Sequence, residues 1–153
     1  HGIRLEERRR QAVLGLGDVG GVPAVLAKPR TYMNRNGIAA RYILDRFHVG
    51  LENLLVVYDD MDLPVHTIRL RAGGGTAGHR GIESVIAELG TQEFPRLKIG
   101  VGHPAERGDE VSHVLGPFTA EEAKTIEEPL EQAVEAITWM IEYGLGSAMN
   151  RFN

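Results

Sequence analysis

The most constraining feature of the sequence is the run NLLVVYDD, residues 53–60, in which five successive apolar side chains end in two acids. A continuous apolar run of this kind is typical of a strand that is buried on both faces, as strands are in parallel or mixed sheets. Such sheets need helices to connect and to cover their strands. The run therefore predicts an α/β fold.

The other segments predict strands and helices in alternation. We expect strands near residues 12–16 and 22–27, joined by a glycine turn, and at 66–72 and 96–102. A helix is expected after the loop that begins at residue 31, and a second one at 81–90, closed by Gly90. Without repeats or low-complexity linkers, residues 1–153 predict a single three-layer α/β domain, with a mixed, mostly parallel sheet and helices on both faces.

The last third predicts a long acidic helix. Thr119 and Glu122 have the spacing of a capping box, and Pro129 predicts a kink or a break. The segment 119–153 holds seven acids and two basic residues, a net charge of -5, and most of its glutamates are expected on a solvated face. One apolar stripe is predicted along this helix, formed by Ala123, Ile126, Leu130, Ala133, Ile137 and Met140.

Composition excludes several classes of protein. A chain of 153 residues that is 42% hydrophobic and 25% charged can bury a core. It has no cysteine, hence no disulfide and no thiol nucleophile, and no apolar run of about 20 residues that would span a bilayer. We therefore expect a cytoplasmic enzyme or binding protein that acts as a monomer and has no membrane partner.

The basic residues leave two interpretations open. The net charge of -4 argues against a protein that coats nucleic acid without specificity. Fourteen of the 17 basic residues are nevertheless arginine, whose planar fork suits contacts with phosphate. Genome composition can also make a protein rich in arginine. The arginine content alone therefore does not establish a phosphate-binding site.

The stretch GLGDVG, residues 15–20, matches a dinucleotide-binding fingerprint letter for letter. A functional fingerprint opens a helix whose N-terminus faces the pyrophosphate. Here Gly21, Val22 and Pro23 follow, and the residues after them favour a strand. The stretch predicts a hairpin turn, and no nucleotide cofactor is implied.

Three polar segments are candidates for chemistry. Asp59, Asp60 and Asp62 end the buried strand, where they would bind a divalent metal, orient a histidine that acts as general base, or simply cap the strand end. Asn34 precedes a helix. It would act either as the N-cap of that helix or as a group that binds an ester carbonyl or the oxyanion formed from it. RLRAGGGTAGHRG, residues 69–81, is a phosphate cradle, part of a catalytic centre or a mobile turn.

Six motifs occur in the order and at closely similar spacing found in one family. The sequence resembles the bacterial-type peptidyl-tRNA hydrolases over practically its whole length. The resemblance implies hydrolysis of the ester between a peptide and the terminal ribose of tRNA, which recycles the tRNA, with peptidyl-tRNA as partner and without a metal or a cofactor. The motifs are KPRTYMNRNG, VVYDDMDLP, RLRAGGGTAGHRGIESVI, LGTQEFPRLKIGVGHP, VLGPF and AMNRFN.

The resemblance also implies residue roles. Asp59 corresponds to the aspartate that orients the catalytic histidine, and Asn34 to the asparagine that contacts the substrate and positions water. Tyr32, Gly78 and His79 are implied at the substrate, and the glycine-rich stretch forms one wall of the groove for the tRNA acceptor end.

Arg80 departs from the family pattern, which usually has an asparagine here. It would grip a phosphate at a helix N-terminus or be a plain surface arginine. In the second case we expect the grip on RNA in Arg30, Arg35 and Lys98 or upstream of His1.

The family's N-terminal segment, which carries the catalytic histidine, a first strand and a first helix, does not precede Gly2. We expect an incomplete chain rather than a natural variant that lacks this segment.

Two alternatives to the hydrolase remain. One is an RNA-binding module that has lost the histidine, since relatives of this fold in plant organelles serve RNA splicing. The other is a metal-dependent phosphohydrolase built on Asp59, Asp60 and Asp62, for which no histidine or glutamate has supporting ligand spacing.

Overall fold

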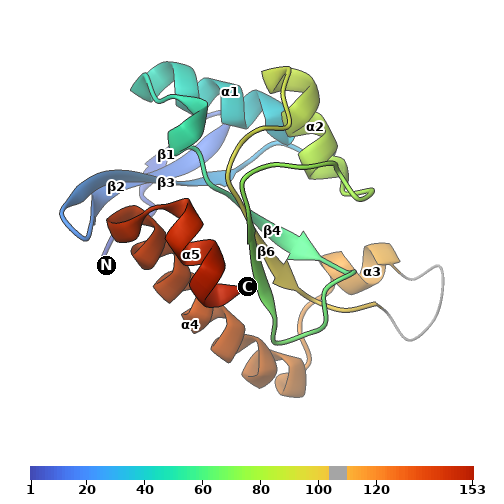
Figure 1. The fold of residues 1–153 in the computed structure, drawn as a ribbon. Coiled ribbons are helices and arrows are strands. Elements are labelled where there is room, and N and C mark those ends of the chain that lie inside the picture. Colours follow the sequence, from blue (N-terminus) through green and yellow to red (C-terminus); the bar gives the residue numbers. More distant parts are fainter. Residues whose placement is uncertain (104–109) are drawn as a thin grey trace. The chain divides into compact units, whose positions relative to one another are not determined.

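The computed structural model describes residues 1–103 and 110–153 and confirms the predicted α/β class (Figure 1). The chain forms two compact units. Unit 1 comprises residues 1–54 and 72–95, and unit 2 comprises residues 55–71 and 96–153. Since the chain crosses between the units three times, each unit is built from segments distant in sequence. The assignment of the whole chain to one domain stays a prediction.

Unit 1 contains a hairpin of β2 (Ala12–Val19) and β3 (Val22–Pro29), with β1 (Glu7–Arg8) on the other edge of β2. Gly20 and Gly21 form its turn with φ angles of +62° and +85°, which only glycine adopts readily. The Asp18 carboxylate accepts the Gly21 N–H at 2.6 Å. The hairpin predicted for GLGDVG is confirmed, and β2 is longer than expected because it runs through this motif.

Two helices complete unit 1, α1 (Asn36–Phe47) and α2 (Arg80–Leu89), with the 3₁₀ turn η1 (Met33–Arg35) before α1. The helices meet at Gly37, whose N–H donates to the Ser84 hydroxyl at 3.0 Å. A Cβ atom on Gly37 would overlap the Ser84 carbonyl oxygen, so only glycine permits this approach. A second 3₁₀ turn, η2 (Leu51–Asn53), follows α1, and Gly90 closes α2 in the left-handed conformation as predicted.

Unit 2 contains a sheet of β4 (Val56–Asp60), β6 (Arg96–Gly100) and β5 (Ile68–Arg71), in that order. β4 and β6 are parallel, whereas β5 runs antiparallel to β6, so the predicted mixed sheet is confirmed. Antiparallel pairing is commoner than expected, at three of the four pairings within residues 1–103. β4 lies at the edge of this sheet, and Val57 is 46% exposed, so the strand is not buried on both faces as predicted.

Three helices belong to unit 2, α3 (Glu110–Leu115), α4 (Ala120–Tyr143) and α5 (Leu145–Phe152). The predicted capping box begins α4: the Thr119 hydroxyl accepts the Glu122 N–H at 3.2 Å, and the Glu122 carboxylate accepts the Thr119 N–H at 2.8 Å. This backbone donor holds the pKa of Glu122 below its usual value. α4 continues through Pro129, so the predicted break does not occur.

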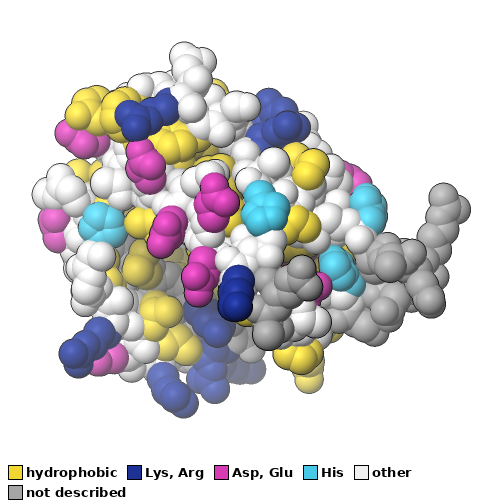
Figure 2. All heavy atoms as spheres, turned by 90° about the horizontal axis from the view of Figure 1, so that it is seen from below, with side chains coloured by type: hydrophobic (Ala, Val, Ile, Leu, Met, Phe, Trp, Pro, Cys, Tyr) yellow, Lys and Arg dark blue, Asp and Glu magenta, His cyan; other side chains and the backbone are white. Residues whose placement is uncertain are grey.

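The buried face of α4 differs from the predicted stripe. Pro129, Ala133 and Ala136 are buried, whereas Leu130 is 45% exposed, and Ala123 is exposed as well. Successive residues of a helix point about 100° apart around its axis. A small rotation of the helix about this axis therefore buries Pro129 instead of Leu130. Small side chains allow α4 to approach the core that contains Leu70 and Leu97 closely. Figure 2 shows hydrophobic side chains next to acidic ones on the displayed surface.

The last helix, α5, was not predicted. It packs on α4, where the Trp139 indole N–H donates to the Ser147 hydroxyl at 3.0 Å and the Arg151 guanidinium lies 3.9 Å from the Trp139 ring centroid. The Asn153 side chain accepts the Leu70 N–H at 2.8 Å and donates to the Leu70 carbonyl at 3.0 Å. These two bonds satisfy backbone groups on the open side of the edge strand β5.

The close approach of α1 and α2 predicts that alanine substitutions at two glycines differ in their effect on stability. Gly37→Ala should lower the free energy of unfolding by about 1–3 kcal/mol, because the added methyl group overlaps the Ser84 carbonyl oxygen. The control is Gly146→Ala in α5, where nothing lies within 4 Å of the new Cβ; it should leave stability unchanged or raise it by up to about 1 kcal/mol. Urea unfolding measures both, and equal effects would contradict the packing described.

Candidate functional site

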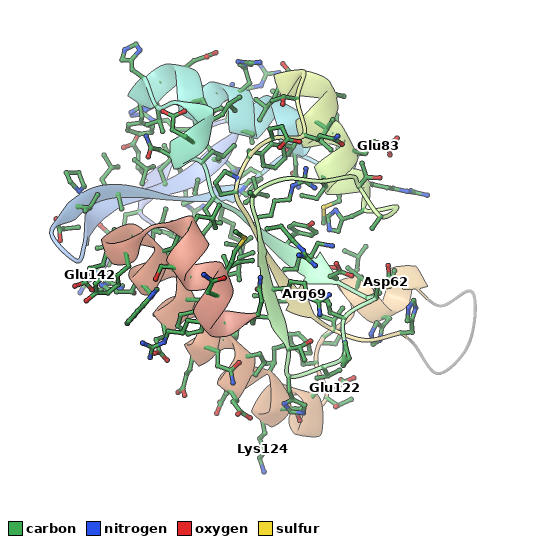
Figure 3. The ribbon with its side chains drawn as sticks, viewed as in Figure 1. Asp62, Arg69, Glu83, Glu122, Lys124 and Glu142 are labelled. Atoms are coloured by element: carbon green, nitrogen blue, oxygen red, sulfur yellow. The ribbon has the colours of Figure 1, made fainter. Side chains whose placement is uncertain are left out.

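A groove of about 610 Å³ lies in unit 1 between one side, formed by η1 and the start of α1, and the other, formed by one face of α2 along its length. Basic and amide side chains lie near the beginning of both helices, while the acids come from α2, from which Glu83 projects in Figure 3. The groove therefore offers both donors and acceptors to a polar ligand. Its lining comprises Asn34, Arg35, Ile38, Arg80, Glu83, Ser84, Ala87 and Glu88.

The turn that carries Asn34 is stabilised by the side chain of Asn36. The Asn36 side chain accepts the Thr31 hydroxyl at 2.8 Å and donates to the Met33 sulfur at 3.3 Å. Arg35, not an asparagine, occupies the N-cap position of α1, and it makes no side-chain cap bond, so the N-cap interpretation of Asn34 is wrong. Asn34 is exposed, and the adjacent Tyr32 is 82% exposed. Both side chains are accessible from solvent.

His79 is the N-cap of α2. Its Nδ1 accepts the N–H groups of Gly81 at 3.1 Å and Ile82 at 3.2 Å. An accepting Nδ1 carries no hydrogen, so the neutral ring has its hydrogen on Nε2. A Cβ atom on Gly81 would lie 2.8 Å from both the His79 ring and the Met33 sulfur. Glycine therefore makes room for the ring.

This cap changes what the start of α2 can bind. Two backbone N–H groups that would face an anion at a helix N-terminus already donate to the imidazole. A phosphate at this end would have to be contacted by the Arg80 side chain, which is exposed and lines the groove.

The glycine-rich stretch 69–81 is not one loop. Arg69 and Arg71 are the exposed residues of β5 in unit 2, whereas the glycines that follow belong to unit 1. Ala77 and Gly78 are both left-handed, with φ angles of +46° and +77°, and the Gly78 N–H donates to the Thr76 hydroxyl at 3.3 Å. The stretch thus ends a strand, makes a tight turn and begins a helix.

The three acids at the end of β4 and just beyond it do not converge. Strand alternation places Asp59 and Asp60 on opposite faces of the sheet. The Asp60 carboxylate, 8% exposed, accepts the Lys98 ammonium at 2.6 Å and the Asp62 N–H at 2.9 Å. Asp62 is exposed beyond the end of β4, where its carboxylate lies 3.1 Å from His103 Nε2 (Figure 3).

These contacts bear on two sequence-based hypotheses. Among residues 1–103 and 110–153, no group of three or more His, Asp or Glu side chains is placed to hold a metal ion. Lys98 is bound to Asp60 and is only 19% exposed, so the structure gives no support to its predicted role in gripping RNA. Pro104, the last residue of one resemblance motif, lies outside the described residues.

The structure brings some predicted residues together and leaves others apart. Asn34 and Arg80 line one groove, and His79 caps the helix that Arg80 begins. Tyr32 and Gly78 belong to the same unit, whereas Asp59 belongs to unit 2. Sequence reasoning missed Glu83, Ser84 and Glu88 as groove residues; their recurrence at helical spacing on α2 was the available signal.

Comparisons with known proteins define the class as a hydrolase. The profile of the family described as peptidyl-tRNA hydrolase matches residues 1–153. The chain belongs to the peptidyl-tRNA hydrolase family, so the resemblance and the enzyme class are confirmed.

Individual relatives agree. The peptidyl-tRNA hydrolase of Carboxydothermus hydrogenoformans is 46% identical over 153 residues, which are 100% of this chain and 81% of the relative. That of a Synechococcus strain is 48% identical over 147 residues, 96% of this chain and 66% of the relative. A crystal structure of a point mutant of the peptidyl-tRNA hydrolase from Acinetobacter baumannii is similar in fold, with a TM-score of 0.90. Its sequence is 30% identical to this one, and the match covers 99% of this chain and 78% of that chain.

Within the part of the chain that the structure describes, no helix is both long and apolar enough to cross a membrane.

The His79 cap leads to a stability prediction. His79→Ala should lower the free energy of unfolding by about 1 kcal/mol, because two N–H groups lose their acceptor. His79→Asn should retain most of that stability, since an asparagine oxygen also caps a helix. Denaturant unfolding of the two variants measures the difference, and equal losses would show that the ring stabilises unit 1 by some other contact.

Proposed function

We propose that this protein hydrolyses the ester bond that links a peptide to tRNA and so recycles the tRNA. The observation that carries the proposal is the 46% identity to a peptidyl-tRNA hydrolase along the entire chain. We also propose that it acts in the cytoplasm as a monomer on peptidyl-tRNA. The relatives' names favour the enzyme over the RNA-binding module that has lost its histidine.

The reaction needs an activated water, an acceptor for the developing oxyanion and a grip on the RNA phosphates. The groove supports two of these requirements. The exposed Asn34 amide can donate to the ester carbonyl, and the Arg80 guanidinium can bind a phosphate. Tyr32, Gly78 and His79 belong to the same unit and complete the proposed substrate contacts.

Water activation is assigned to a histidine oriented by Asp59, as the resemblance to the family implies. An aspartate in this role fixes the imidazole orientation and stabilises the imidazolium that forms. In β4, Asp59 shares a sheet face with its neighbour Ile99 and is only partly exposed. Its location at a strand end is typical of ligand sites in α/β sheets.

The activity itself and the Asp59 role are tested together, in the full reading frame that contains this chain. The parent should release N-acetylaminoacyl groups from charged tRNA, and Asp59→Asn should lower that rate by about 10² or more with tRNA binding near normal. The readouts are initial hydrolysis rates and filter binding of tRNA. A parent that binds tRNA without hydrolysis would favour the RNA-binding module, and a variant with parental turnover would remove Asp59 from the mechanism.

Arg80 gives a separate test of the groove. Arg80→Ala should weaken tRNA binding and make the slope of log affinity against log salt shallower by about one unit, as expected for one lost phosphate contact. Arg80→Asn should give the same shallower slope, yet equal or faster turnover at saturating substrate, because an amide can hydrogen-bond near the ester. If both variants keep the parental slope, Arg80 is a surface arginine.

A further inference from the structure

Four basic residues lie on the three-stranded sheet of unit 1, and we call Arg8, Arg10, Lys28 and Arg30 the outer strip. Arg8 and Lys28 are both cross-strand partners of Val13, so their side chains share one face. Arg30 continues β3 on that face, since its N–H donates to the Gln11 carbonyl at 2.9 Å. Arg10 lies in the turn between β1 and β2. All four are exposed.

The opposite face of the same sheet is the inner one. Leu14 lies there and is fully buried, and its partner Glu7 accepts bonds from Arg9 and from Arg46 of α1, both at 2.6 Å. The hydrogen bond from Arg9 is the main reason that the pKa of Glu7 lies below its usual value. The charges of the inner face are thus paired, and α1 packs there. On the outer face, Ile3 and the Arg4 backbone lie against Gly15 and Gly17, while the four residues of the outer strip stay exposed.

The outer strip is not neutralised in this way. Within the described residues, no acidic side chain bonds to Arg8, Arg10 or Lys28. Glu6, which lies just before β1 and two residues before Arg8, is 3.7 Å from the Arg4 guanidinium. The Arg30 guanidinium donates to the Arg9 carbonyl at 3.0 Å, which fixes its position without consuming its charge.

We propose that the outer strip binds the phosphate backbone of the tRNA, as a contact separate from the α1–α2 groove. Arg8 and Lys28 are two strands apart, about 10 Å, which suits successive phosphates better than one small anion. The strip lies on a sheet face, where an extended backbone can follow it, and three of its four members are arginines, which bind phosphate through two N–H groups. The inference rests on the proposed function, because that function supplies tRNA as the ligand.

Arg8 at the end of β1 and Arg9, the residue that follows it, provide a matched experiment. Arg8→Gln and Arg9→Gln remove the same charge, but from opposite faces of the sheet. In tRNA binding measured from about 50 to 200 mM salt, Arg8→Gln should make the log–log slope shallower by about 0.7–0.9, and Arg9→Gln should not change it. The double variant with Arg8→Gln and Lys28→Gln should change the slope twice as much. Its affinity for tRNA should therefore fall mainly at low salt.

Two further measurements separate the possible outcomes. Hydrolysis of an N-acetylaminoacyl ester of the CCA trinucleotide should be equal in the parent and the Arg8 variant, because this substrate lacks the RNA that the strip contacts. If the parent hydrolyses neither substrate, the proposed function fails while the salt slopes still report on the strip. Equal slopes for Arg8→Gln and Arg9→Gln overturn the inference. Loss of binding to phosphatidylserine vesicles in Arg8→Gln, with tRNA slopes unchanged, would assign the strip to membranes instead.

Discussion

The alternation of side chains along extended strands decides where charge lies in both units. In β4 it sends Asp59 and Asp60 to opposite faces, and Asp60 then pairs with Lys98 from the adjacent strand. At the end of β1 the same rule separates Arg8 from the following Arg9, which binds Glu7 on the inner face. Residues that are neighbours in sequence therefore do not share a ligand here. Ligand sites arise where different elements bring side chains to one face.

The groove in unit 1 depends on a second constraint, the close approach of α1 and α2. Gly37 lets the helices touch at Ser84, and Gly81 lets the His79 ring and the Met33 sulfur fit against the start of α2. Both glycines are thus required for side-chain and backbone packing rather than for access of phosphate to the backbone. Asn34 and Arg80 line the groove beside this contact, which joins the first turn of α1 to the middle of α2.

Local rules predicted much of the fold, because their determinants lie within a few residues. The Gly20–Gly21 turn, the Gly90 helix end and the Thr119 capping box are of this kind. Long-range contacts could not be predicted. The ion pair of Lys98 and Asp60 joins strands 38 residues apart, and the buried face of α4 is set by packing against the sheet. The His79 cap was missed because histidine is not among the usual capping residues.

The arginine excess shows why composition alone could not locate a phosphate site. Arg9 and Arg46 share Glu7, Arg151 is bound to Glu135 and stacked on Trp139, and Arg96 is 1% exposed in the core. An arginine whose charge is already paired gains little from a phosphate, because it must first give up its carboxylate. Strand register separates these from the residues of the outer strip, whose charges face solvent together. The capacity to bind a polyanion therefore depends on which strand face an arginine occupies rather than on how many arginines the chain contains.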